Sequence, residues 1–152
     1  MKMKCVYFLA ALFISGCGSL PTGNKSHLGK VSFTDTDVFD KNISDSMSVD
    51  TQSIDVAMIG KVSINHIPER LGKWLNVVNE EGQVTLKSTQ VPGDDPQTTK
   101  SISIGAVLGL LPMVYDYFER KLTYSAAEQY DATIFYNAAT GVIDKVVFSK
   151  KQ

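Results

Sequence analysis

The chain has 152 residues, of which 43% are hydrophobic and 20% charged, proportions that predict one small globular domain. A formal net charge of -1 leaves no overall basic field, so we do not expect nucleic-acid binding. Only two histidines, His27 and His66, are present. Because histidine is the commonest general base and metal ligand, we expect neither catalytic residues nor a metal site.

The first residues have the pattern of an export signal. Lys2 and Lys4 make the start of the chain positive, and residues 5–14 form an apolar run too short to span a bilayer. The run ends in the sequence Ile14-Ser15-Gly16-Cys17, with small residues directly before a cysteine. This segment resembles the signal peptide and lipobox of bacterial lipoproteins. The resemblance covers residues 1 to about 20 and carries no fold for the remainder.

The resemblance implies removal of residues 1–16 and lipidation of Cys17, by a diacylglyceryl thioether and an N-acyl chain such as palmitate. This covalent lipid is the one cofactor-like group we expect, and it would anchor the chain to the membrane. Gly18 rather than aspartate follows the cysteine. That residue choice implies an outer-membrane protein facing the periplasm. The alternative is an ordinary secretory signal followed by a plain thiol at Cys17.

Composition divides the mature chain into two parts. Residues 17–50 begin with a turn-forming polar stretch and carry five scattered aspartates, which predicts a lipidated cysteine followed by a flexible polar tether. Alternating apolar residues make partial ordering of 31–39 an equally weighted alternative. We expect residues 51–152 to form the periplasmic domain, and the last three residues to be a frayed tail.

The first elements of that domain have contrasting periodicities. Residues 54–64 alternate in apolar character on both sides of Gly60, which predicts one long strand bent at that glycine. Leu71, Trp74, Leu75 and Val78 follow helical spacing and predict a helix over 68–82, closed by Gly82 as a left-handed cap. Trp74 lies in the middle of this apolar stripe, so we expect it to anchor helix against sheet rather than stack on a ligand.

A second strand is predicted over 84–88, followed by a loop that contains two prolines and the pair Asp94-Asp95. Two adjacent carboxylates bring a calcium site to mind. A calcium loop needs more oxygen ligands at alternating positions, so we expect a solvated loop.

The segment 102–118 is almost wholly apolar or aromatic. It is too short and too interrupted by Gly105, Gly109 and Pro112 to span a membrane. Two interpretations remain open: a kinked core helix, or a short strand followed by a glycine-rich loop that packs on or projects from the domain. If exposed, the segment would contact a partner or ligand. Candidate contact residues are Ile104, Val107, Leu108, Leu111, Met113, Tyr115 and Tyr117.

The C-terminal third predicts sheet. Ser125 and Glu128 have the spacing of a capping box and predict one helical turn. Alternation over 130–136 and again over 142–148, around Gly141, predicts a hairpin. The expected fold class is therefore α+β, a small mainly antiparallel sheet with two helices packed on one face.

Two functions follow as hypotheses. The first is a non-enzymatic interaction or envelope-maintenance module, anchored through its lipid and contacting an envelope protein. The alternative is a carrier or binding module for an apolar or aromatic small ligand, held between 102–118 and the sheet. An enzyme would need a site around His66, with acids such as Glu69, Asp116 or Asp131, and a lone histidine is usually structural.

Overall fold

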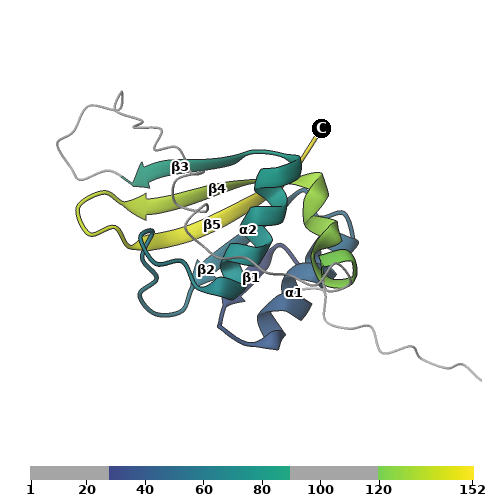
Figure 1. Ribbon diagram of the computed structural model, residues 1–152, viewed down its shortest axis with the longest axis horizontal. Helices are drawn as coiled ribbons and strands as arrows, with labels where there is room; N and C mark the ends of the chain where they lie inside the picture. The colour runs from purple at the N-terminus through teal and green to yellow at the C-terminus, as the bar shows by residue number, and fades with distance from the viewer. Residues whose placement is uncertain (1–27, 90–119) are drawn as a thin grey trace, which may run out of the picture.

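The computed structural model describes residues 28–89 and 120–152, and Figure 1 shows the path of the chain. In these ranges one sheet has the strand order β1-β2-β5-β4-β3. The elements in chain order are β1 Lys30–Phe33, α1 Asp37–Ser48, β2 Ser53–Met58, α2 Glu69–Glu81, β3 Val84–Thr89, the π-helical turn η2 Arg120–Tyr124, the 3-10 helix η3 Ser125–Gln129, β4 Tyr130–Asn137 and β5 Ile143–Lys150.

The sheet is mixed, so the expectation of a mainly antiparallel sheet is wrong. β5 lies in the centre and pairs antiparallel with both β2 and β4, for example through Ile54 opposite Phe148. Each outer pair, β1 with β2 and β3 with β4, is parallel. Parallel neighbours need a long connection between them. Here α1 connects β1 to β2, and residues 90–129 connect β3 to β4.

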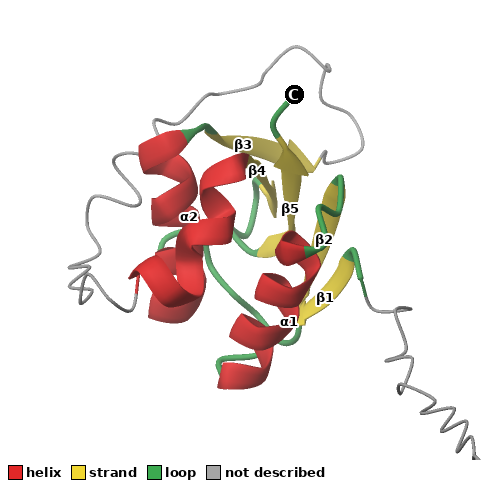
Figure 2. Ribbon diagram, turned by 90° about the vertical axis from the view of Figure 1, so that its right-hand side faces the viewer, coloured by secondary structure: helices red, strands yellow, loops and turns green. Residues whose placement is uncertain are grey.

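Helices and helical turns lie on one face of the sheet (Figure 2), which confirms the α+β class. Period-two alternation places one set of strand side chains against them, as in β4, where every second residue is buried. The largest fully buried side chains are Trp74, Tyr130, Phe39, Phe148, Ile43, Ile54, Leu71, Leu75, Ile134, Ile143, Val56 and Val77. The core therefore lies between the helices and the sheet.

Several predicted elements are confirmed. The helix over 68–82 is α2, and Trp74 within it is fully buried as a core anchor. β3 matches the strand over 84–88, and the hairpin is β4 and β5. The predicted turn at Ser125 is η3. Of the two predicted helices only α2 can be compared with the structure, because the other, over 102–118, lies outside the described residues.

The ordered part begins earlier than residue 51. β1 and α1 fall within 30–48, a range expected to belong to the tether. α1 is polar overall but buries Phe39, Ile43 and Met47 at a spacing of four residues. That narrow stripe suffices because one face of the helix packs on the core. Of the polar residues of α1, Ser46 is also buried, with its hydroxyl donating to the Asn42 carbonyl at 2.9 Å. Of the two alternatives for this range, partial ordering of 31–39 agrees better with the structure than a fully flexible tether does.

The long strand predicted over 54–64 is also wrong. β2 ends at Met58, and Gly60 has a φ of 92°, in the left-handed region that glycine adopts without strain. The chain turns there. Val62 and Ile64 are still buried, and Ile64 N–H donates to the Gly141 carbonyl at 2.8 Å. The alternation across Gly60 thus reflects two separate buried segments.

The C-terminal end of α2 does not have the predicted left-handed glycine cap. Instead, Gly82 is extended and lies close to Lys151 and Asp131. Gly82 has a φ of -152°, and a Cβ there would lie 2.5 Å from Lys151 Cε and 2.7 Å from Asp131 Oδ1. Lys151 Nζ donates to the carbonyls of Glu81 at 2.5 Å and Glu128 at 2.8 Å. A lysine at helix carbonyls satisfies acceptors that the helix leaves open. The end of the chain is therefore fastened rather than frayed.

Tyr130 gives the fold an alkaline sensitivity. Its buried phenol donates to the Thr51 carbonyl at 2.8 Å. Burial raises the pKa of this phenol above its ordinary value of 10, and the charge of Asp50 raises it further. The folded state therefore holds the proton more tightly than the unfolded chain does, so this contribution to stability is complete below about pH 10.

We expect the free energy of unfolding to fall as pH rises above about 10 toward the folded-state pKa of Tyr130. Tyr130→Phe is expected to flatten this fall and to cost about 1 kcal/mol at neutral pH for the lost hydrogen bond. Urea denaturation at pH 8 and at alkaline pH measures both effects. A variant with the same alkaline decline as the unaltered chain would contradict the assignment.

Candidate functional site

The site lies where α1 faces α2 on the helix-covered side of the sheet. Arg70 and Trp74 are four residues apart on α2, so they occupy successive turns of one helix face. Asp40 is on α1, one residue after the buried Phe39. Packing of the two apolar stripes into the same core brings these polar groups together from positions 30 or more apart in the chain.

Asp40 joins the two helices. One carboxylate oxygen, Oδ1, accepts the indole N–H of Trp74 at 2.8 Å, and Oδ2 accepts from Nη1 of Arg70. The Asp40 side chain is 14% exposed. A carboxylate this buried requires charged or hydrogen-bonded partners, and it has both. Asp40 therefore links α1 to α2 through these two bonds.

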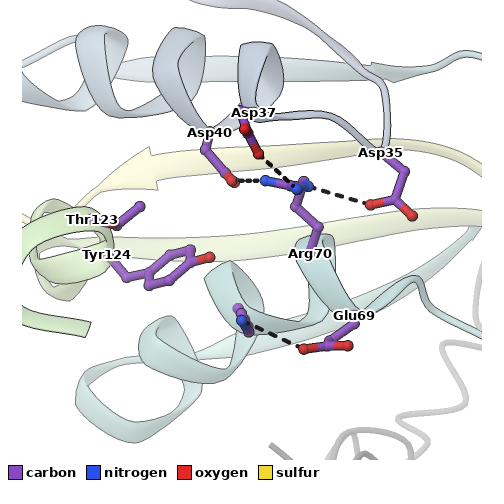
Figure 3. A pocket seen from close by; sticks show the side chains of 8 residues that line it. Asp35, Asp37, Asp40, Glu69, Arg70, Thr123 and Tyr124 are labelled. Carbon is purple, nitrogen blue, oxygen red and sulfur yellow. Dashed lines mark hydrogen bonds and ion pairs between the residues drawn. The ribbon is translucent and has the colours of Figure 1, made fainter. Parts of the chain in front are cut away.

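Arg70 also contacts two aspartates that precede or begin α1. Its Nη2 lies 2.9 Å from Asp37 Oδ1, and its Nε donates to Asp35 Oδ1 at 3.3 Å. Partial burial lowers the pKa of Arg70, but the charge of Asp40 and hydrogen bonds to Asp40 and Asp37 outweigh it and raise the pKa above its ordinary value. The guanidinium is therefore a permanent cation directed at three carboxylates (Figure 3).

A pocket of about 500 Å³ opens beside this cluster (Figure 3). Tyr124 forms part of its wall, with its ring edge-on to Trp74 at 4.8 Å between centroids. Lys73 pairs with Glu69 at 3.4 Å. The lining residues are Asp35, Asp37, Asp40, Glu69, Arg70, Lys73, Thr123 and Tyr124, which comprise four carboxylates and two cations. The formal charge of the pocket is therefore -2.

The exposed carboxylates are the groups that can meet an outside ligand. The side chains of Asp35 and Asp37 are 68% and 96% exposed, in contrast to Asp40. The donors of Arg70 are directed at the aspartates of the chain itself, so they hold these carboxylates in place. The arrangement suits ionic contact with a cationic group.

Of the three acids named with His66, the two that the structure describes have other partners. His66 is exposed, next to the turn that bridges it to Ser63. Glu69 faces Lys73, and Asp131 accepts the backbone N–H of Gln83 at 2.8 Å. Asp116 lies outside the described residues. The structure thus assigns the two described acids to other partners.

Cys17 and all the candidate contact residues from Ile104 to Tyr117 lie outside the described residues, as does the pair Asp94-Asp95. Within 28–89 and 120–152, no three side chains of the metal-ligating types are grouped to hold an ion. The helices in those same ranges are all too short or too polar to cross a membrane.

Comparison with family models, with curated proteins and with solved structures found no match to this chain. The pocket therefore has to be interpreted from its own residues. Sequence reasoning missed Arg70 and the three aspartates. One usable signal was present: Arg70 and Trp74 share a helix face, and a buried indole N–H needs an acceptor.

Proposed function

We propose that this chain is a lipid-anchored protein of the bacterial envelope, attached at Cys17, whose α+β domain is a non-enzymatic interaction module facing the periplasm. The single observation that carries the proposal is the sequence Ile14-Ser15-Gly16-Cys17 directly after a positive start and an apolar run. In this proposal Cys17 anchors the protein to the membrane, and the α+β domain makes the contacts with other proteins.

The fold sets how far the domain would lie from the membrane. Because β1 begins at Lys30, about ten residues, 18–27, separate Cys17 from the described part of the chain. Ten residues span at most about 36 Å. A tether of that length would keep the domain within reach of proteins in or near the same membrane, which supports an interaction role.

The charged pocket favours interaction over the alternative function. An apolar or aromatic ligand needs a mainly apolar cavity. The pocket formed by the described residues is lined mainly by charged side chains. The carrier hypothesis depended on 102–118, which lies outside those residues, and stays a prediction.

The anchor is tested by replacing each cysteine in turn. Cys17→Ser is expected to abolish incorporation of labelled palmitate and to move the protein from the membrane fraction to the soluble fraction. Cys5→Ser is the matched control, because it removes the only other cysteine and leaves residues 14–17 intact. It should retain label and membrane association. Label that persists in Cys17→Ser, or is missing from the unaltered chain, would disprove lipidation at Cys17.

A further inference from the structure

We infer that the pocket between α1 and α2 receives a basic side chain from a partner protein, presented by a segment that also carries apolar residues. This inference rests on the proposed interaction role and specifies the chemistry of the partner. Its support comes from the distribution of charge, from the geometry of the carboxylates and from two exposed apolar side chains.

Negative charge is concentrated at the pocket. The described residues carry eleven Lys and Arg and twelve Asp and Glu, a formal charge of -1. The pocket alone carries -2, so the rest of this part of the chain is close to neutral. A concave site with a net negative charge steers groups of the opposite sign toward it.

The four carboxylates of the pocket differ in how accessible they are to a cationic group of a partner. Asp40 is committed to Arg70 and Trp74 inside the fold. Asp35 and Asp37 are held by Arg70 but remain mostly exposed, and Glu69 is 75% exposed. Carboxylate groups already positioned by the fold lose little conformational freedom on binding. A lysine or arginine entering here would replace water at these rim carboxylates.

Two exposed apolar side chains indicate a macromolecular partner independently of the charge. Val38 is 63% exposed and follows Asp37; Leu122 is 81% exposed and precedes Thr123 of the pocket lining. Exposed apolar groups beside a polar hollow are typical of protein interfaces rather than of sites for small ions. The negative pocket also disfavours anionic lipid head groups. A basic, partly apolar protein segment satisfies both features.

Photo-crosslinking in the native host tests the surface with a matched pair of positions. Benzoylphenylalanine is placed in the chain at Val38, the residue after Asp37 of the pocket lining, or at Ile59, the residue after the end of β2. Both side chains are 63% exposed, so exposure alone cannot distinguish them. We expect an adduct from Val38 and not from Ile59, and a crosslinked partner peptide that contains lysine or arginine.

Charge variants then test the carboxylates. In the chain that carries benzoylphenylalanine in place of Val38, the double substitution Asp35→Asn and Asp37→Asn is expected to lower the yield of crosslinked adduct about 2- to 30-fold. This is the range for the loss of two exposed ionic contacts. Asp45→Asn with Asp55→Asn is the control, because it removes the same charge from two half-exposed aspartates that do not line the pocket. This control is expected to retain the adduct.

Several outcomes would overturn the inference. In the crosslinking experiment they are equal adducts from Val38 and Ile59, no adduct, or an adduct to lipid or to a second copy of this chain. A crosslinked partner peptide without basic residues would also overturn it. In the charge variants, the contradicting result is an equal loss of adduct in both. Lipidation at Cys17 is scored separately by palmitate incorporation in the same cells. Failure of the pocket and failure of the anchor are therefore distinguishable.

Discussion

Replacing Trp74 with alanine is expected to lower the free energy of unfolding by about 3–5 kcal/mol, the cost of truncating a buried aromatic side chain. The indole is fully buried, packs edge-on against Tyr124 and donates to Asp40 at 2.8 Å. Truncation would open a cavity and remove one of the donors of a mostly buried carboxylate. Urea denaturation followed by far-UV circular dichroism measures the loss without tryptophan fluorescence, which this variant lacks.

Trp74→Phe is the matched control for this result. It keeps an aromatic ring against Tyr124 and removes the indole N–H, so its cost is expected to be about 1–3 kcal/mol. A smaller loss for phenylalanine than for alanine separates ring packing from the hydrogen bond. A loss below about 1 kcal/mol for the alanine variant would contradict the burial of Trp74, because cavity formation of this size costs more.

Arg70→Met is expected to cost about 2–3 kcal/mol, because it leaves the mostly buried Asp40 without its charged partner. Methionine preserves much of the length of the arginine side chain. Adding Asp40→Asn should cost less than the two single losses combined, because the aspartate charge that Arg70 neutralises is then gone. Denaturant midpoints of the single and double variants give the coupling free energy directly.

The control for charge removal at an exposed position is Lys41→Met. Lys41 pairs with Asp45 at 2.6 Å on the surface of α1, where both side chains are about half exposed or more. Such helix pairs contribute about 0.5 kcal/mol or less. If Arg70→Met costs no more than Lys41→Met, the Arg70–Asp40 pair does not hold the helices together.

Local periodicity decided which elements could be predicted. α2 has four apolar residues at helical spacing, and β4 alternates over eight residues, so both are visible in the sequence. α1 has Phe39, Ile43 and Met47 at a spacing of four, but serines and aspartates around them resemble a linker. Its helix depends on burial of that narrow stripe against the sheet, a tertiary contact that no local window contains.

Strand directions and the pocket depend on longer-range information. β3 precedes β4 by 40 residues, and nothing in either strand specifies parallel pairing, which follows from the path of the connection. Arg70 could be recognised as a neighbour of Trp74 on one helix face. Its partner Asp40, in contrast, is 30 residues away on a helix that the sequence did not reveal. A site whose residues come from different helices or strands is therefore harder to predict from the sequence than the helices and strands themselves.

The position of β5 has a consequence for the order in which the molecule can form. β5 is the last strand along the chain and the central strand of the sheet, so the pairs β1–β2 and β3–β4 meet only through it. A two-stranded pair alone is marginal in water. When the chain is synthesised from its N-terminus, the described sheet is therefore completed only once β5 has emerged from the ribosome. The topology therefore makes the complete described sheet depend on the synthesis of β5.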